Sequence, residues 1–179
     1  ELYDAELDKL GEEPERVVEL GLRVAQVYEV QLESLDNAVA RYRRVLDADV
    51  ENQSAVRALD RLFSQGERWA ELTEVLKREA DIGQSPDEIL EFKFRLGQVH
   101  QLRLGDVDRA IDAYREVINA APEHADTLAA LEGLFESGVK QLEIAEILEP
   151  LYQQAGEWEK LIRVREAELI HITDADQRI

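Results

Sequence analysis

Three histidines are the first residues of this chain whose type could support metal binding or proton transfer. They are His100, His124 and His171, and none of them pairs with another at the short spacing that brings two imidazoles to one metal ion. His100 also replaces Tyr28 in an internal duplication of the chain, which favours a packed side chain over a ligand. The histidines therefore predict no metal site.

The acidic run Asp47-x-Asp49-x-Glu51 resembles the start of a calcium-binding loop. It departs from that pattern at Asn52, where the loop needs glycine, and at Ala58, where a bidentate glutamate should stand. Cysteines, glycine-rich phosphate loops and nucleophile elbows are absent from the sequence. We therefore expect no catalytic residue, no cofactor and no bound metal, and the sequence predicts a protein that is not an enzyme.

The composition restricts the partners. The chain holds 40 acidic and 21 basic residues, which gives a net charge of −19, and such a surface repels the phosphates of nucleic acids. With 45% hydrophobic residues the sequence predicts a folded chain, but no apolar run approaches the ~20 residues of a membrane span. The compartment stays undecided, with the cytoplasm favoured, because any signal or anchor would lie outside this stretch.

The elements that position these residues repeat along the chain. The sequence LDNAVARYRRVLDADVEN from Leu35 returns as VDRAIDAYREVINAAPEH from Val107, a shift of 72 residues that also pairs Gln26 with Gln98 and Tyr42 with Tyr114. An internal duplication of this length predicts a stacked repeat architecture.

Apolar residues at three- and four-residue spacing predict two helical hairpins in each copy. Gly66 and Gly156 are expected to end helices, Pro86 to stand in a first turn, and Pro150 to kink or break a helix. We expect Trp69 and Trp158 to act as wedges between helices.

The predicted fold class is all-α, a right-handed α–α superhelix (solenoid) of helix-turn-helix repeats. We expect one array over residues 1–179, with hairpins at about 13–48, 52–82, 86–120 and 124–172 and residues 1–10 as the tail of a preceding repeat. We interpret the chain as a piece of a longer protein.

Two of the predicted hairpins resemble the tetratricopeptide repeat, whose pattern is Leu-Gly-x-x-Tyr in a first helix and Ala-x-x-x-Phe, then Pro, in a second. The matching residues are Leu96-Gly97 with His100, Ala110 with Tyr114, Pro122, and the pairs Val24/Tyr28 and Ala38/Tyr42. The other repeats are degenerate, of a bacterial type. Asp60 and Glu132 stand where the pattern has a small residue, which predicts a looser helix crossing there.

The resemblance implies a concave groove lined by the first helix of each pair, which binds a peptide or helix. The residues that project there are Glu19, Leu22, Gln26, Glu29, Arg57, Arg61, Glu91, Phe94, Gln98 and Gln101. Leu22 or Phe94 would be an apolar anchor with a polar rim, or else would complete the core between repeats. The net acidity favours a basic or amphipathic partner over an acidic one.

Three functional classes follow from these observations. The first is a non-catalytic scaffold or adaptor for protein–protein interaction. The second is a structural role with end-to-end self-association of the array. The third is a regulatory or substrate-presenting repeat domain of a larger multidomain protein or enzyme.

Overall fold

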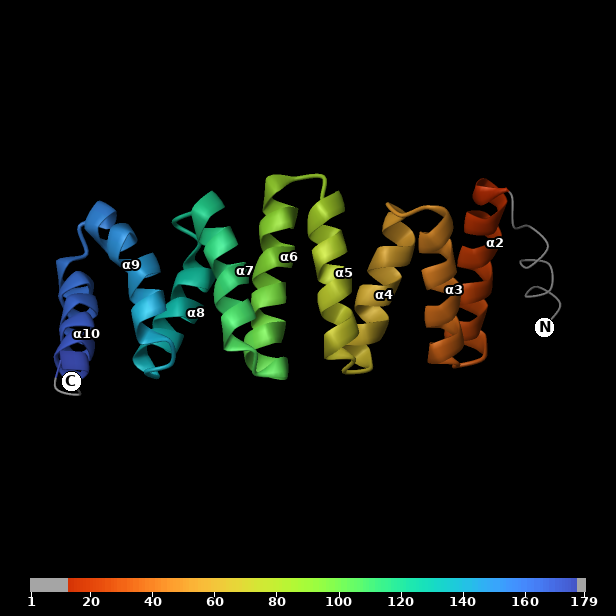
Figure 1. Cartoon of the computed structure of the whole chain (residues 1–179). Coiled ribbons are helices and arrows are strands. Elements are labelled where there is room, and N and C mark those ends of the chain that lie inside the picture. Colours follow the sequence, from red (N-terminus) through yellow and green to blue (C-terminus); the bar gives the residue numbers. More distant parts are fainter. Residues whose placement is uncertain (1–12, 177–179) are drawn as a thin grey trace. The chain divides into compact units, whose positions relative to one another are not determined.

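The computed structural model describes residues 13–176, without the side chains of residues 171–176 (Figure 1). Every described residue lies in a helix or in the loop between two helices, so the prediction of an all-α chain is confirmed. The expected tail over residues 1–10 and the side chain of His171 lie outside this description. The chain divides into two compact units, Glu1–Val99 and His100–Ile179.

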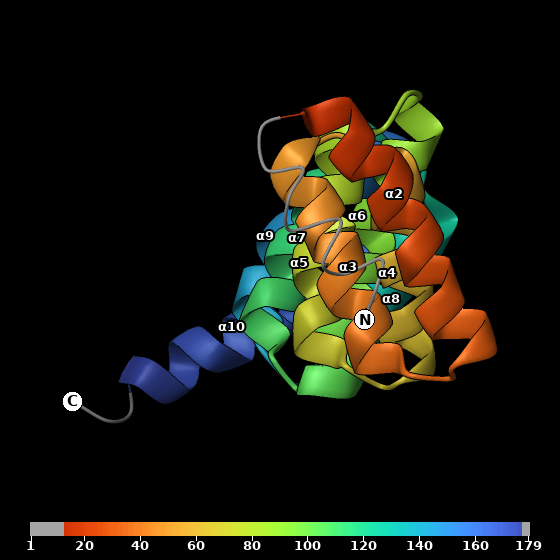
Figure 2. The ribbon, with the colours of Figure 1, turned by 90° about the vertical axis from the view of Figure 1, so that its right-hand side faces the viewer.

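Unit 1 is a row of antiparallel helices joined by short turns. They are α2 (Pro14–Gln26), the π-helix η1 (Val27–Gln31), α3 (Leu35–Ala48), α4 (Gln53–Gln65), α5 (Trp69–Ile82) and α6 (Pro86–Val99). Each helix packs on the next, and α2 and α3 lie in front in Figure 2. This is the hairpin-by-hairpin stacking of a solenoid.

Unit 2 follows the same plan. Its helices are the π-helix η2 (His100–Leu104), α7 (Val107–Ala120), α8 (Ala125–Glu136), α9 (Gln141–Ala155) and α10 (Trp158–Asp176). The predicted range 124–172 thus holds three helices, not one hairpin. That all these helices form a single right-handed array stays a prediction.

Helix ends follow local chemistry. Pro86 stands in the first turn of α6, and Gly66 and Gly156 directly follow α4 and α9, as predicted. Gly156 has φ = 71°, in the left-handed region that costs glycine little. The carboxylate of Asp106 accepts a hydrogen bond from the backbone N–H of Arg109 and so caps α7.

Pro150 does not break its helix, because α9 runs from Gln141 through Ala155. Proline removes one backbone donor, and burial of neighbours such as Leu148 and Tyr152 holds the helix together around that gap. Trp69 packs against the core of unit 1, whereas Trp158 is 62% exposed, so the wedge prediction is wrong for Trp158.

The core of unit 1 lies between the helix pairs. Ala25 and Ala38 are fully buried and let α2 and α3 approach closely, while Tyr42 fills the space beside them. Phe63 and Leu76 continue this core into α4 and α5. Small and aromatic side chains therefore do the packing that their repeated positions predict.

The core of unit 2 uses equivalent residues. Ala110 and Tyr114 of α7 are fully buried, and Leu131 of α8 and Ile144 of α9 are buried with them. His100 is only 2% exposed, so it is a packed side chain, as its replacement of Tyr28 indicates. His124 caps α8, because its Nδ1 accepts from the backbone N–H of Thr127.

The helix bounds keep the 72-residue shift along the described chain. α3 and α7 begin and end 72 residues apart, and α2, α6 and α10 begin at Pro14, Pro86 and Trp158. The left-handed residues that precede α3 and α7, Glu33 (φ = 48°) and Gly105 (φ = 67°), also match in this register. The structural period thus extends beyond Gly138, where the two sequences diverge.

Candidate functional site

An open hollow of about 400 Å³ lies between α2, α3 and α4 in unit 1. Its lining combines apolar and polar side chains: Leu22 and Gln26 from α2, Tyr42 from α3, and Ser54, Arg57, Ala58 and Arg61 from α4. Four of the residues predicted to line a groove therefore come together here, namely Leu22, Gln26, Arg57 and Arg61.

Glu29 contacts two of the side chains that line this hollow, Tyr42 and Arg61. The π-helical turn of η1 brings its carboxylate to the Tyr42 hydroxyl, which donates to Oε2 at 3.1 Å. The Arg61 guanidinium binds both carboxylate oxygens, at 2.6 and 3.1 Å. Burial and the bond to Glu29 raise the pKa of Tyr42 to about 12, so the hydroxyl keeps its proton. The three side chains fix one wall of the hollow.

Leu22 and Arg57 are the groups that the hollow offers to a ligand. Leu22 is half-buried and packs against the core, which leaves part of its side chain facing the hollow. Arg57 is exposed and forms no ion pair with any described side chain, in contrast to Arg61, which Glu29 neutralises. The hollow therefore presents an apolar surface beside a guanidinium that is free to donate hydrogen bonds.

The other predicted residues lie elsewhere. Glu19 is exposed on α2 and pairs with Arg23 at 2.9 Å; Glu91 is exposed and Gln98 half-buried on α6. Phe94, also on α6, is only 8% exposed, so it completes the core and cannot be an accessible anchor. Gln101 belongs to unit 2, where it accepts a 2.7 Å hydrogen bond from the Tyr114 hydroxyl.

A charged cluster holds α4, α5 and α6 together in the same unit. Arg95 binds Asp60 through two hydrogen bonds of 2.8 Å, and Ser64 donates to the same carboxylate at 3.1 Å. This bidentate pair joins α4 to α6, while the looser helix crossing expected at Asp60 stays a prediction. Although burial alone would raise the pKa of Asp60, its bonds from Arg95 and Ser64 keep it below the ordinary value.

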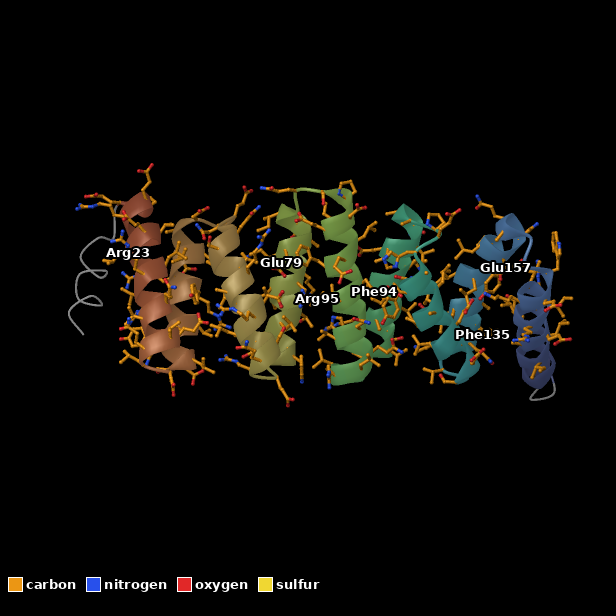
Figure 3. The ribbon with its side chains drawn as sticks, turned by 180° about the vertical axis from the view of Figure 1, so that it is seen from behind. Arg23, Glu79, Phe94, Arg95, Phe135 and Glu157 are labelled. Carbon is orange, nitrogen blue, oxygen red and sulfur yellow. The ribbon has the colours of Figure 1, made fainter. Side chains whose placement is uncertain are left out.

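Glu79 faces this pair from α5, and Figure 3 labels it beside Arg95. Glu79 is only 3% exposed, and its burial together with the negative charge of Asp60 raises its pKa to about 8. At neutral pH the cluster thus holds one arginine, one carboxylate and one protonated acid. The sequence reasoning missed Glu79, although its spacing from Leu72, Val75 and Leu76 places it on the buried stripe of α5.

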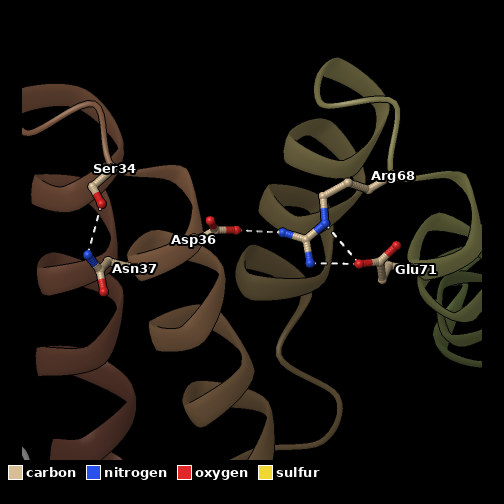
Figure 4. A network of polar contacts seen from close by, with 5 residues as sticks. All are labelled: Ser34, Asp36, Asn37, Arg68 and Glu71. Carbon is tan, nitrogen blue, oxygen red and sulfur yellow. Dashed lines mark hydrogen bonds and ion pairs between the residues drawn. The ribbon is translucent and has the colours of Figure 1, made fainter.

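Ion pairs also join successive hairpins in both units. Arg68 at the start of α5 donates to Asp36 on α3 at 2.9 Å and to Glu71 at 2.6 and 2.9 Å (Figure 4). In unit 2, Lys140 contacts Asp108 at 2.5 Å, and both residues lie 72 positions after Arg68 and Asp36. These exposed pairs add little stability, but they show that side-chain contacts repeat along with the helices.

Two searches of the described residues bear on other kinds of site. No three histidine or acidic side chains in this part of the chain converge as metal ligands would. None of the described helices is sufficiently long and apolar to span a bilayer. The fold and the hollow define a helical-repeat protein with an open interhelical surface.

Comparison with known proteins gives no match at the level of sequence and a distant likeness to solved structures. No protein-family model and no curated protein sequence matches the chain. Among solved structures, the crystal structure of MamA is similar, with 15% sequence identity and a TM-score of 0.44, over 98% of this chain and 87% of that chain. This likeness is too distant to carry an argument, and the fold assignment rests on the helices of the chain itself.

Proposed function

We propose that this chain is a non-catalytic scaffold of tetratricopeptide-like repeats that binds a peptide or helix of another protein in the hollow of unit 1. The observation that carries this proposal is the convergence of Leu22, Gln26 and Arg57 around an open space whose wall Glu29 fixes. A preorganised wall lowers the entropy cost of binding, and a half-buried leucine beside polar donors suits an apolar anchor with a polar rim.

The bound segment is amphipathic. Its apolar side chain would contact Leu22, and its backbone carbonyl groups would accept hydrogen bonds from Arg57 and Gln26. The net charge of −19 attracts segments that carry lysine or arginine outside the hollow.

The test is affinity capture from the native host with wild-type protein and two variants, Leu22→Glu and Arg57→Glu. Both variants should lose the captured partner, and Arg57→Glu, at an exposed position, should do so with the wild-type melting temperature. Lys77→Glu is the matched control, because it makes the same charge change on an exposed residue of α5 outside the hollow. Equal capture by all four proteins would refute the hollow of unit 1 as the binding site.

A second candidate function is end-to-end self-association, and α10 favours it. Trp158, Ile162 and Leu169 are 62%, 55% and 62% exposed, and their spacing places them along one stripe of this helix. If this stripe joins two copies, light scattering should show a mass that rises with concentration in wild type and stays monomeric in Ile162→Glu/Leu169→Glu. A concentration-independent monomeric mass in wild type would remove this alternative.

A further inference from the structure

A second hollow, of about 770 Å³, lies in unit 2 between the turn that precedes α8, α8 itself, the end of α9 and the start of α10. Its apolar walls include Leu128 and Leu151, which are half-buried, and Ala155, which is exposed. None of these residues belongs to the groove that the sequence predicts.

The equivalent place in unit 1 is almost closed. A hollow of only about 20 Å³ is lined there by Val56, Glu79, Gly83 and Phe92. Counting 72 residues onward, these positions hold Leu128, Leu151, Ala155 and Val164 in unit 2. The two hollows therefore occupy the same site in the repeat.

Two substitutions distinguish the linings of the two hollows. A Cβ atom on Gly83 would lie 2.6 Å from Cγ1 of Ile89, so glycine at this position lets α6 pack closely on the end of α5. Ala155 carries a Cβ atom at the equivalent position of unit 2 and lines the large hollow there. Phe92, which packs on the core of unit 1, is replaced by the smaller Val164, which lines a further 130 Å³ beside the large hollow.

The charged groups of the unit 2 hollow are mostly acidic. Lys160 donates to Glu132 at 2.8 Å and to Glu157 at 2.9 Å, while the Tyr152 hydroxyl donates to Glu132 at 2.8 Å. Glu123 lines the same hollow. Three carboxylates face one ammonium, and this arrangement attracts a cation.

We propose that the unit 2 hollow binds a segment of another protein that inserts one large apolar side chain and places a lysine or arginine beside Glu123 and Glu157. The protein's own Phe92 and Ile82 side chains line the equivalent site of unit 1, which shows that the site accepts such groups from a polypeptide. This surface is separate from the hollow of unit 1, and its binding does not depend on the function proposed there.

The probe is a phage-displayed library of random 12-residue peptides, selected on the whole chain and measured as labelled peptides by fluorescence anisotropy. Selected peptides should combine an aromatic or large aliphatic residue with lysine or arginine. Ala155→Trp fills the hollow from an exposed position and should weaken their binding by at least about tenfold. Glu157→Lys should also weaken it.

Matched controls stand at exposed positions away from the hollow. Ala40→Trp in unit 1 and Glu159→Lys in α10 should leave the affinity unchanged. Leu22→Glu should likewise have no effect, because Leu22 lies on α2 and does not line the unit 2 hollow.

Three outcomes would overturn the proposal. The first is an absence of enriched peptides, and the second is enrichment of peptides that Ala155→Trp does not weaken. In this second case, loss of binding with Leu22→Glu alone would place the peptides in unit 1 and leave the proposed function intact. The third is binding of free N-acetylphenylalaninamide as tight as that of the peptides, which would assign the hollow to a small molecule.

Discussion

The junction of three successive helices, called the seam below, is closed in unit 1 (α4, α5 and α6) and open in unit 2 (α8, α9 and α10). In unit 1, Arg95 of α6 reaches Asp60 of α4, and Gly83 lets the helices close on each other. In unit 2, Lys160 of α10 reaches Glu132 of α8, but a hollow of about 770 Å³ remains beside this pair.

This difference teaches that the repeat sets where helices begin and end, while a few side chains set how tightly they close. Both units keep a cation from the third helix on an acid of the first. The volume between the helices changes with residues such as Gly83 and Ala155, which leave the helix bounds almost unaltered. Substitutions can therefore open or close a site in this fold without changing the arrangement of its helices.

The largest expected effect concerns the buried tyrosine that the two units share, which is Tyr42 in unit 1 and Tyr114 in unit 2. Tyr114→Ala removes a fully buried ring and should lower the free energy of unfolding by about 3–5 kcal/mol, measured as a shift of the urea midpoint. Tyr114→Phe, the control, keeps the ring but loses the hydroxyl bond to Gln101 and should cost about 1 kcal/mol. Unchanged midpoints in Tyr114→Ala would contradict the packing role of this residue.

A pH effect between about pH 4.5 and 8 should come from Glu79 in unit 1. The folded state keeps the proton of Glu79 up to a pKa of about 8, whereas the unfolded state releases it near 4.5. The unfolded state therefore binds fewer protons between these values, and the free energy of unfolding falls as pH rises from about 4.5 to 8. The loss is on the order of 5 kcal/mol, given about 1.4 kcal/mol for each pKa unit between 4.5 and 8.

Glu79→Gln should remove this decline, as seen in urea titrations at pH 5, 7 and 9. The neighbouring charges that set the effect are Asp60 and Arg57 on α4 and Arg95 on α6. The depressed pKa of Asp60 has the opposite slope, but only below about 3.8, outside this window. The control is Glu74→Gln on the exposed face of α5, and an equal slope in Glu79→Gln and wild type would exclude Glu79 as the source.

Gly83→Ala tests the closure of the unit 1 seam. The new Cβ must displace Ile89, and we expect a loss of about 1–3 kcal/mol in thermal or urea unfolding. Gly133→Ala is the matched control in unit 2, because nothing lies within 4 Å of its Cβ and alanine favours the helix by about 0.5–1 kcal/mol. Stabilisation by both substitutions would mean that Gly83 does not control the seam.

The smallest expected difference concerns Arg61, whose equivalent in unit 2 is Gly133. Arg61→Ala should cost about 0.5–1 kcal/mol, since the side chain is half-exposed and pairs with Glu29. In a Glu29→Gln background, which imitates Gln101, the same substitution should cost less. Equal losses in the two backgrounds would show that Arg61 does not act through Glu29.

Helix positions could be predicted from the sequence because they depend on local chemistry. Gly66, Pro86 and Gly156 mark helix ends through backbone preferences that need no tertiary contact. The break considered at Pro150 is not present, because burial of the residues around it outweighs one missing backbone hydrogen bond, while the alternative of a kink stays a prediction.

The candidate site was less predictable. Spacing gives the direction in which a side chain points, and it grouped Leu22, Gln26 and Arg57, which line one hollow in the structure. It does not give the distance between helices, so it did not separate Leu22, which faces a hollow, from Phe94, which is buried. For the unit 2 hollow, a signal was present in the replacement of Gly83 by Ala155 and of Phe92 by Val164, but sequence alone does not give the volume that these replacements leave between the helices.

The π-helical turns η1 and η2 have a consequence for how the two copies of the repeat compare. Each is followed by a backbone hydrogen bond that reaches back six residues. The N–H of Ser34 donates to the carbonyl of Tyr28, and the N–H of Asp106 donates to the carbonyl of His100, at matching places in the 72-residue period. A π turn carries one residue more than the α-helical turn it replaces, and such turns are rare. Both copies of the repeat therefore carry the extra residue at the same place, although the left-handed position that follows is glycine at Gly105 and glutamate at Glu33.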